Sequence, residues 1–351
     1  MMPRWRPRIL SDPRWRYLLA AVLLAAFPVA EAFAQAPGAF ARVGFGARGI
    51  AMGGGLSADV FEQASPFYNP ALAPLAAPQA VDAAAGFLSM DRELQHGQFT
   101  FRLPPRAGAA IGIIRAGVSG IDGRDASGYH TGELSTEESV VFTTFGLAFS
   151  QRVSGGLGLR FYRSDLLDGI SAPVTIGLSI GLAARVSDRL AFGFAVDDLL
   201  ARYSWDTAAL GGGSRTVDRF PVRVRFGSAY QLGEGRGLLT AEVEAQARPV
   251  VVRTYTTRDL GGQPQLVVQD ERQTFGSTLL RFGGEYWLVE PFAVRAGVDR
   301  IGQDGLGGAA PAGGFALRHT FGEISGRVDY TVMLEPYGLG VMHMVALSLD
   351  L

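Results

Sequence analysis

The chain has 351 residues, of which 48% are hydrophobic and 19% charged, and its 32 basic residues nearly balance 33 acidic ones. The sequence contains no cysteine, which excludes disulfides, thiol nucleophiles and thiolate metal sites. Every basic residue is an arginine, and the near-neutral charge gives no basic footprint of the kind that nucleic-acid binding needs. We therefore expect no nucleic-acid partner.

Residues 1–34 have the pattern of an export signal. Several arginines precede an apolar run over residues 17–29, and the small-x-small sequence Ala32-Phe33-Ala34 follows it. A helix needs roughly 20 apolar residues to cross a bilayer, so this run is too short, and no other segment is long enough. We predict a signal peptide over residues 1–34. If the remaining chain spans a membrane, we expect it to do so with β-strands.

Residues 35–80 are rich in glycine, alanine and proline and show no clear periodicity. Gly44, Gly46 and Gly49 have the spacing of a dinucleotide-binding fingerprint. That fingerprint requires a strand before the glycines, a helix after them and an acidic residue about 20 positions further on, within an alternating βαβ pattern. This context is missing, so we reject a nucleotide site and expect the glycines to serve close backbone packing.

A longer pattern continues from these glycines and carries a resemblance to a known family. Its matching residues are Gly46, Ala47, Arg48, Gly49, Ala51, Met52, Gly53, Gly54, Asp59, Ala64, Asn69, Pro70, Ala71 and Leu72. The pattern resembles the amino-terminal signature of the outer-membrane superfamily that contains the FadL long-chain fatty-acid transporters and the PorV/PorQ proteins of type IX secretion. Gly55 stands where that family often has alanine.

The resemblance implies a fourteen-stranded barrel whose amino-terminal segment, here residues 35–80, folds into or beneath the lumen as a plug or hatch. Two roles stay open for the motif: it closes the base of the barrel, or it forms a gate that contacts a ligand. Asn69-Pro70 suits a tight turn in which the asparagine side chain bonds the backbone.

From residue 81 to residue 351, segments of alternating polarity are separated by clusters of Gly, Asp, Ser and Pro. In Ile324–Leu334, for example, Val328 and Tyr330 fall on one face while Arg327 and Asp329 fall on the other. In a soluble sheet the charged face meets water, whereas in an outer-membrane barrel it lines the lumen and the apolar face meets lipid.

The lengths of the connections separate these two architectures. We predict fourteen strands, at 81–90, 97–102, 107–118, 138–150, 156–165, 174–186, 190–198, 221–231, 237–247, 278–288, 291–299, 313–320, 323–334 and 341–351. From the second strand onward short and long connections alternate, which is typical of a barrel with short periplasmic turns and long outer loops. The prediction is an all-β fold: a transmembrane antiparallel β-barrel over residues 81–351, with a projecting hairpin inside the long connection 248–277.

The inner face of this barrel carries charges of both signs, which we expect to pair across strands. The predicted lumen residues are Arg160, Arg223, Arg225, Glu242, Glu244, Arg281, Glu285, Arg295, Asp299, Arg327 and Asp329. An apolar ligand would meet aromatic side chains of the outer loops and hatch. The candidates are Phe61, Phe67, Tyr68, Tyr203 and Trp205.

Nothing in the sequence indicates catalysis. The four histidines lie in different segments without metal-binding spacing, and no nucleophile has an oriented base, so we expect no enzyme, metal or cofactor. We predict a PorV/PorQ-like, protein-binding component of an outer-membrane secretion system, because the chain leaves little room for a large plug and loop 248–277 offers strand edges. The alternative is a FadL-like channel for long-chain fatty acids or other hydrophobic small molecules. Both place the protein in the bacterial outer membrane, with membrane lipid and either secreted proteins or a hydrophobic solute as partners.

Overall fold

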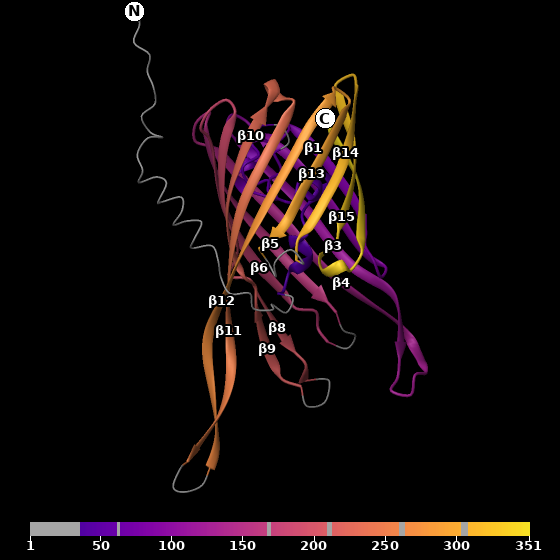
Figure 1. The fold of residues 1–351 in the computed structure, drawn as a ribbon, viewed down its shortest axis with the longest axis vertical. Helices are drawn as coiled ribbons and strands as arrows, with labels where there is room; N and C mark the ends of the chain where they lie inside the picture. The colour runs from indigo at the N-terminus through magenta and orange to yellow at the C-terminus, as the bar shows by residue number, and fades with distance from the viewer. Residues whose placement is uncertain (1–35, 62–63, 167–169, 209–212, 260–263, 303–307) are drawn as a thin grey trace, which may run out of the picture.

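The fold is a closed antiparallel barrel of fourteen strands with an amino-terminal segment inside it (Figure 1). The computed structural model describes residues 36–61, 64–166, 170–208, 213–259, 264–302 and 308–351. The prediction of an all-β, fourteen-stranded barrel is confirmed. The predicted signal peptide, residues 1–34, lies outside the described residues.

Each barrel strand pairs with its neighbour along the chain, except where the β8–β9 hairpin lies between β7 and β10. The barrel strands are β1 (Gln79–Phe87), β2 (Arg92–Leu103), β3 (Ala107–Arg124), β4 (His130–Ala148), β5 (Val153–Asp165), β6 (Val174–Arg185), β7 (Leu190–Leu199), β10 (Val222–Leu232), β11 (Gly237–Asp259), β12 (Pro264–Val289), β13 (Phe292–Ile301), β14 (Ala310–Phe321), β15 (Ile324–Leu334) and β16 (Val341–Asp350). β1 closes the ring by pairing with β16, from Ala80 opposite Asp350 to Phe87 opposite His343.

Several strands are longer than the sequence pattern predicted. The ladder between β10 and β11 ends where Val222 faces Ala247, but β11 and β12 stay paired to Asp259 and Pro264 and project as a two-stranded ribbon. β3 and β4 also extend through much of the predicted loop 119–137. The predicted loop 199–220 contains a short hairpin of its own, β8 (Arg202–Asp206) and β9 (Arg215–Arg219). These extensions all lie at one end of the barrel, opposite the short turns and the carboxyl terminus (Figure 1).

The alternation along each strand sorts apolar side chains outward and charged ones inward. Ile113, Phe145, Leu157 and Phe226 are among many large apolar residues whose side chains are exposed on the outer surface. A band of this kind is what a membrane barrel presents to lipid. No helix among the described residues has the length and apolar composition to span a bilayer.

The described residues between 36 and 78 form a plug inside the barrel and contain no strand. The plug contains the short helices η2 (Ala39–Arg42), α2 (Gly46–Ala51) and η3 (Pro70–Leu75). Helix α2 packs against β13, β14, β15, β16 and β1, whereas η3 packs against β2 to β6. The plug thus reaches across the lumen and contacts opposite walls.

Candidate functional site

The glycines of the fingerprint-like stretch give the plug its backbone path. Gly44, Gly46, Gly53 and Gly54 all have positive φ, at 127°, 67°, 65° and 73°, where a side chain would be strained. They place α2 between two tight turns against the wall. The stretch is therefore part of the plug and forms no strand–turn–helix phosphate site.

The wall meets the plug through glycines of its own. A methyl group added at Gly193 of β7 would collide with the backbone carbonyl of Ser57, and one added at Gly283 of β12 would collide with that of Met52. The same holds, with plug atoms as the obstacle, on most strands from β3 to β13. This set, which we call the glycine belt, comprises Gly108, Gly146, Gly156, Gly181, Gly193, Gly227, Gly283 and Gly297. Along the belt, plug and wall touch with no space for a side chain.

Arg48 ties helix α2 of the plug to the wall. Its guanidinium lies 2.7 Å from Asp59 of the plug and 3.1 Å from Glu285 of β12, and all three side chains are buried. Burial opposes the charge of Arg48, but Glu285 and Asp59 outweigh it and hold the pKa of Arg48 well above its ordinary value. The network continues from Glu285 to Arg295 and from there to Asp329.

A second network of buried charges lines the opposite wall. Arg160 of β5 forms ion pairs with Asp197 at 3.1 Å and with Asp198 at 3.4 Å, both on β7. Arg223 of β10 lies 3.7 Å from Asp197 and 3.0 Å from Asp198. Arg225 also donates a hydrogen bond to the backbone carbonyl of Tyr68 in the plug. Arg281 joins this network to Glu242 and Glu244 of β11 and to Asp299 of β13.

The structure places all eleven predicted lumen residues on the inner face of the wall, where ten are buried and Arg327 is half-buried. In the two networks these residues pair with one another and with the plug. A buried ion pair stays charged only when its partners compensate the loss of water. The inner charges therefore hold the plug in place and leave little net charge for ion selection.

Asn69 is the anchor of the second half of the plug. Its side-chain oxygen accepts a hydrogen bond from Ala71 N at 3.0 Å and so caps η3, while its amide donates to the carbonyls of Ser57 at 2.8 Å and Leu182 of β6 at 3.0 Å. Pro70 and Ala71, the neighbours of Asn69 in the motif, pack on the glycine belt. The motif therefore consists mainly of residues that fix the plug to the wall.

An outer pocket of about 480 Å³ lies between the plug and the extended end of the barrel. The plug contributes Phe40, Arg42 and Val43 to this outer pocket. The apolar part of its wall is made by Leu88, Leu94, Ala116, Val118, Leu279, Met333 and Leu339. Burial, together with the nearby Arg223, lowers the pKa of Arg42 to about 10. Arg42 is thus still a cation at neutral pH, and it donates hydrogen bonds to the carbonyls of Ala36 and Pro37.

The five aromatic residues predicted to contact an apolar ligand are absent from the described lining of the outer pocket. Tyr203 packs on Trp205 and on Phe220 within the β8–β9 region. Phe67 stacks inside the plug, Tyr68 lines a different cavity, and Phe61 lies under the guanidinium of Arg185. Aromatic character alone did not indicate which side chains the plug would use for its own packing.

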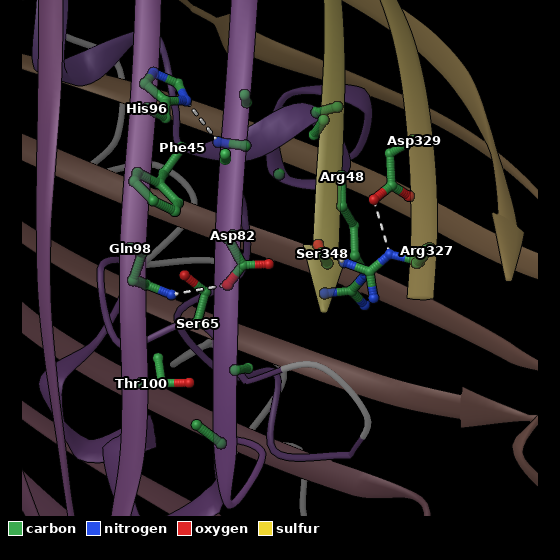
Figure 2. Close-up of a pocket in the computed structure, with 18 of the residues that line it drawn as sticks. Phe45, Arg48, Ser65, Asp82, His96, Gln98, Thr100, Arg327, Asp329 and Ser348 are labelled. Carbon is green, nitrogen blue, oxygen red and sulfur yellow. Dashed lines mark hydrogen bonds and ion pairs between the residues drawn. The ribbon is translucent and has the colours of Figure 1, made fainter. Parts of the chain in front are cut away.

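A second, smaller cavity of about 110 Å³ is lined by residues of helix α2 and of strands β15, β16, β1 and β2 (Figure 2). We call it the inner crevice. Its polar side chains include His96, Gln98 and Thr100 in a row along β2, Asp82 of β1, and Arg327 and Ser348 opposite. Gln98 donates to Asp82 at 3.4 Å, and Arg327 donates to Ser348 at 2.9 Å. Small side chains such as Ala80, Ala84 and Ala346 complete the lining.

Three buried polar atoms in the lining of the inner crevice have no hydrogen-bond partner among the described residues: His96 Nε2, Gln98 Oε1 and Ser65 Oγ. His96 and Gln98 are only 5% and 6% exposed. Because buried polar groups are costly to leave unbonded, these atoms suit water or a polar solute in the crevice. The sequence prediction began the second strand at residue 97 and so missed His96 as an inward residue. Extending the alternation back to Leu94 would have found it.

Phe45 of the plug and His96 of β2 both line the inner crevice. Their rings stack with centroids 5.0 Å apart, and Phe45 also stacks on Phe67 and meets Phe142 edge-on. His96 Nδ1 accepts a hydrogen bond from Gly46 N at 2.8 Å. This pair joins the plug to β2.

No protein-family model and no curated protein sequence matches the chain. Solved structures do match. The toluene transporter TodX of Pseudomonas putida aligns with a TM-score of 0.57 and 13% identity, over 87% of this chain and 97% of that one. The monoaromatic hydrocarbon channel CymD gives 0.56 and 11%, over 88% and 96%. A FadL homologue of Pseudomonas aeruginosa gives 0.54 and 12%, over 87% and 97%.

These neighbours overturn the predicted role as a PorV/PorQ-like secretion component, because the structures that share this barrel are named as hydrocarbon channels and a FadL homologue. The amino-terminal signature could not separate the two branches, since Arg48, Asp59 and Asn69 fix the plug of this chain to the wall and contact no solute or partner. The limited room for a large plug does not favour a secretion role, because the small plug leaves the outer pocket open. The chain has the fold of the FadL-like outer-membrane hydrocarbon transporters.

Proposed function

We propose that the protein is a non-enzymatic channel for the uptake of hydrophobic small molecules across the outer membrane. The observation that carries the proposal is the outer pocket, a cavity of about 480 Å³ with an apolar wall at the extended end of a closed barrel. Ligand pockets for small molecules occupy roughly 300–1,000 Å³ and are lined mainly by apolar side chains with a few polar groups. The outer pocket has this volume, and half of the residues in its lining are apolar. Charged residues also line it: Arg42, Arg92, Glu93, Glu138, Arg248, Arg281, Arg300 and Glu335.

The orientation of the barrel supports uptake. In bacterial membrane barrels the long loops face outward and the short turns face the periplasm. The outer pocket is lined by strand ends and connections of the extended end, including Leu166, Pro221, Arg248 and Tyr337. A solute arriving from outside would therefore meet the apolar pocket before it meets the plug.

Filling the outer pocket tests this function. Ala116 lines the pocket from β3, and Ile113 on the same strand points outward with 44% of its side chain exposed. Replacing Ala116 by Trp adds an indole to the cavity, and we expect A116W to lower the uptake of toluene and of oleic acid roughly tenfold, because the pocket loses its free volume. The measurement is uptake of each radiolabelled compound by cells that depend on the expressed protein.

The matched control is I113W, which places the same ring in the lipid-facing band. We expect it to retain uptake within about twofold of the parent protein, since a lipid-facing aromatic residue is ordinary in a membrane barrel. Equal uptake by A116W and the parent protein, or no uptake of either compound by the parent, would contradict the proposed function.

A further inference from the structure

The short turns, at the end of the barrel opposite the β11–β12 ribbon, repeat one pattern (Figure 1). Four of them end in an arginine directly before the next strand: Arg106 before β3, Arg152 before β5, Arg189 before β7 and Arg236 before β11. We call this set the arginine arc. The two remaining short turns carry Glu290 and Glu323 instead. The rim is therefore divided into a sector with an arginine in every short turn, from β2 to β11, and an acidic sector, from β12 to β15.

The four arginines occupy equivalent places in the backbone. The backbone carbonyl of each accepts a hydrogen bond of 2.7 or 2.8 Å from the neighbouring strand, and the donors in order are Ala148, Arg185, Gln231 and Trp287. Strands of a sheet lie about 4.8 Å apart, and the arginines recur at every second strand, so neighbouring side chains emerge roughly 10 Å apart. The barrel itself thus sets a regular row of cations along its rim.

The arginine arc is not neutralised by the protein. All four residues are exposed, and none of their guanidinium groups has an ion pair or hydrogen bond with another described residue, although Asp188 and Glu234 lie in the same turns. Exposed arginines at the extended end do pair, namely Arg115 with Glu137, Arg124 with Asp122 and Arg163 with Asp165. The arc therefore leaves its charge free for a partner outside the chain.

The arginine arc lies at the edge of the apolar outer band. In three of the turns an outward apolar side chain stands three residues before the arginine: Leu103, Phe149 and Val186 are 39%, 57% and 55% exposed. Such residues end the surface that a membrane barrel presents to acyl chains, and short turns lie on the periplasmic side. A long arginine side chain beside this edge holds its charge among the lipid head groups.

We propose that the arginine arc is a binding site for anionic phospholipids of the periplasmic leaflet. The guanidinium groups bind the lipid phosphates, because a planar guanidinium matches two phosphate oxygens at once. The acyl chains of the same lipids lie against Leu103, Phe149 and Val186. Glu290 and Glu323 repel anionic head groups, so the bound lipids gather on the sector from β2 to β11. The site concerns the membrane around the barrel and does not depend on the solute.

The shape of this end favours a lipid over an acidic protein. Protein interfaces have an apolar core inside a polar rim. No large apolar side chain among the described residues of the plug is exposed, so the end face lacks such a core around the plug. The exposed apolar residues beside the arginine arc belong to the outer band instead. A single row of cations above an apolar wall matches a molecule with one anionic head and long apolar chains.

The test is native mass spectrometry of the protein purified in neutral detergent and titrated with dioleoylphosphatidylglycerol or dioleoylphosphatidylcholine. The two lipids have the same acyl chains, and only the first has a net negative charge. An arginine at a membrane surface strengthens the binding of an anionic lipid by about fivefold. We therefore expect the parent protein to bind phosphatidylglycerol roughly fivefold more tightly than phosphatidylcholine.

The arc variant carries Arg106→Gln, Arg152→Gln, Arg189→Gln and Arg236→Gln. These changes leave the backbone hydrogen bonds of the turns in place, and we expect the two lipid affinities to agree within about twofold. The matched control removes the same number of charges from exposed arginines at the extended end: Arg115→Gln, Arg124→Gln, Arg163→Gln and Arg215→Gln. It is expected to keep the preference of the parent protein. Heat-dependent migration in detergent gels confirms that both variants are folded.

A second readout locates the lipid. Phe149 and Phe321 each stand at the last outward position before a short turn, with 57% and 67% of the residue exposed, but Arg152 follows the first and Glu323 the second. The chain has no native cysteine, so Phe149→Cys and Phe321→Cys each accept a single bimane label. In phosphatidylcholine vesicles with brominated phosphatidylglycerol as a minor component, we expect stronger quenching at Phe149→Cys. Brominated phosphatidylcholine should quench the two labels equally.

Equal affinity of the parent protein for the two lipids, or the same loss of preference in the arc variant and its control, would overturn the lipid site. Equal quenching of the two labels by brominated phosphatidylglycerol would overturn its confinement to one sector. Displacement of bound phosphatidylglycerol by soluble glycerol phosphate would show that the arginines bind free anions, which also contradicts the proposal. Loss of toluene uptake in any of these proteins bears on the proposed function alone.

Discussion

At the residue scale, side chains of the amino-terminal motif bond the plug to the barrel wall. Arg48 bonds Asp59 beside it in the plug and Glu285 across on β12, so one side chain holds two separate parts of the chain. Removing one partner of a buried ion pair leaves the other charge without compensation, which costs more than the pair itself contributes. Arg48 is thus needed to compensate the buried charges of Asp59 and Glu285.

Arg48→Ala tests this role. The substitution leaves Asp59, which is 0% exposed, without its ion-pair partner. We expect the free energy of unfolding in detergent to fall by about 3–5 kcal/mol. The measurement is urea unfolding followed by tryptophan fluorescence. Arg115→Ala is the comparison, because Arg115 pairs with Glu137 on the surface at 2.7 Å and half of its side chain is exposed. That change should cost less than about 1 kcal/mol, and equal losses in the two variants would show that Arg48 does not fasten the plug.

At the scale of elements, the strands have two jobs on their inner face: they carry charge pairs, and they supply the glycine belt. Most belt glycines cannot be exchanged without moving the plug, because the obstacle is plug backbone; at Gly181 and Gly227 it is the side chain of Asn69 and of Ser57. Some strand glycines outside the belt have no such restriction. Gly97 of β2 shows this, since the nearest atom to an added methyl group would be Ile113 Cγ2 at 3.6 Å, an ordinary contact.

We therefore expect Gly193→Ala and Gly97→Ala to differ although both lie in barrel strands. Overpacking against a rigid neighbour costs roughly 1–3 kcal/mol, so Gly193→Ala should lower the free energy of unfolding by that amount and make the plug more sensitive to protease. Gly97→Ala should be neutral or slightly stabilising. Equal resistance of the plug to protease in the two variants would show that the glycine belt does not cause the tight fit between plug and wall.

The sequence was sufficient to predict the strands but not the cavities. Alternation in segments such as Ile324–Leu334 is a local property, so it could be found without knowing the partner strand. The Phe45–His96 pair joins residues from the plug and from β2 whose contact depends on the whole ring. The outer pocket draws on strands from both halves of the chain. A motif of about thirty residues indicated the plug but not its solute.

At the scale of the whole molecule, the barrel and the β11–β12 ribbon are separable. The ladder of β11 with β10 ends at Ala247, and that of β12 with β13 ends where Leu280 faces Ile301. Beyond these pairs the two strands bond to each other. The walls of the outer pocket use Gln246, Arg248 and Leu279 from this region and nothing described further out.

Deleting residues 252–271 and joining the ends with two glycines tests this independence. We expect the variant to fold, as judged by heat-dependent migration in detergent gels, and to take up toluene within about twofold of the parent rate, because the pocket stays complete. A folded variant without uptake would show that the ribbon takes part in capturing the solute.

The tight fit of the plug also constrains how the molecule is assembled. The plug touches the belt without clearance, so it could not be threaded into a ring that had already closed. The plug precedes every barrel strand in the chain, and the ring closes where β1 pairs with β16, beside the inner crevice. We therefore expect the sheet to wrap around the plug as it forms and the β1–β16 pairing to be made last.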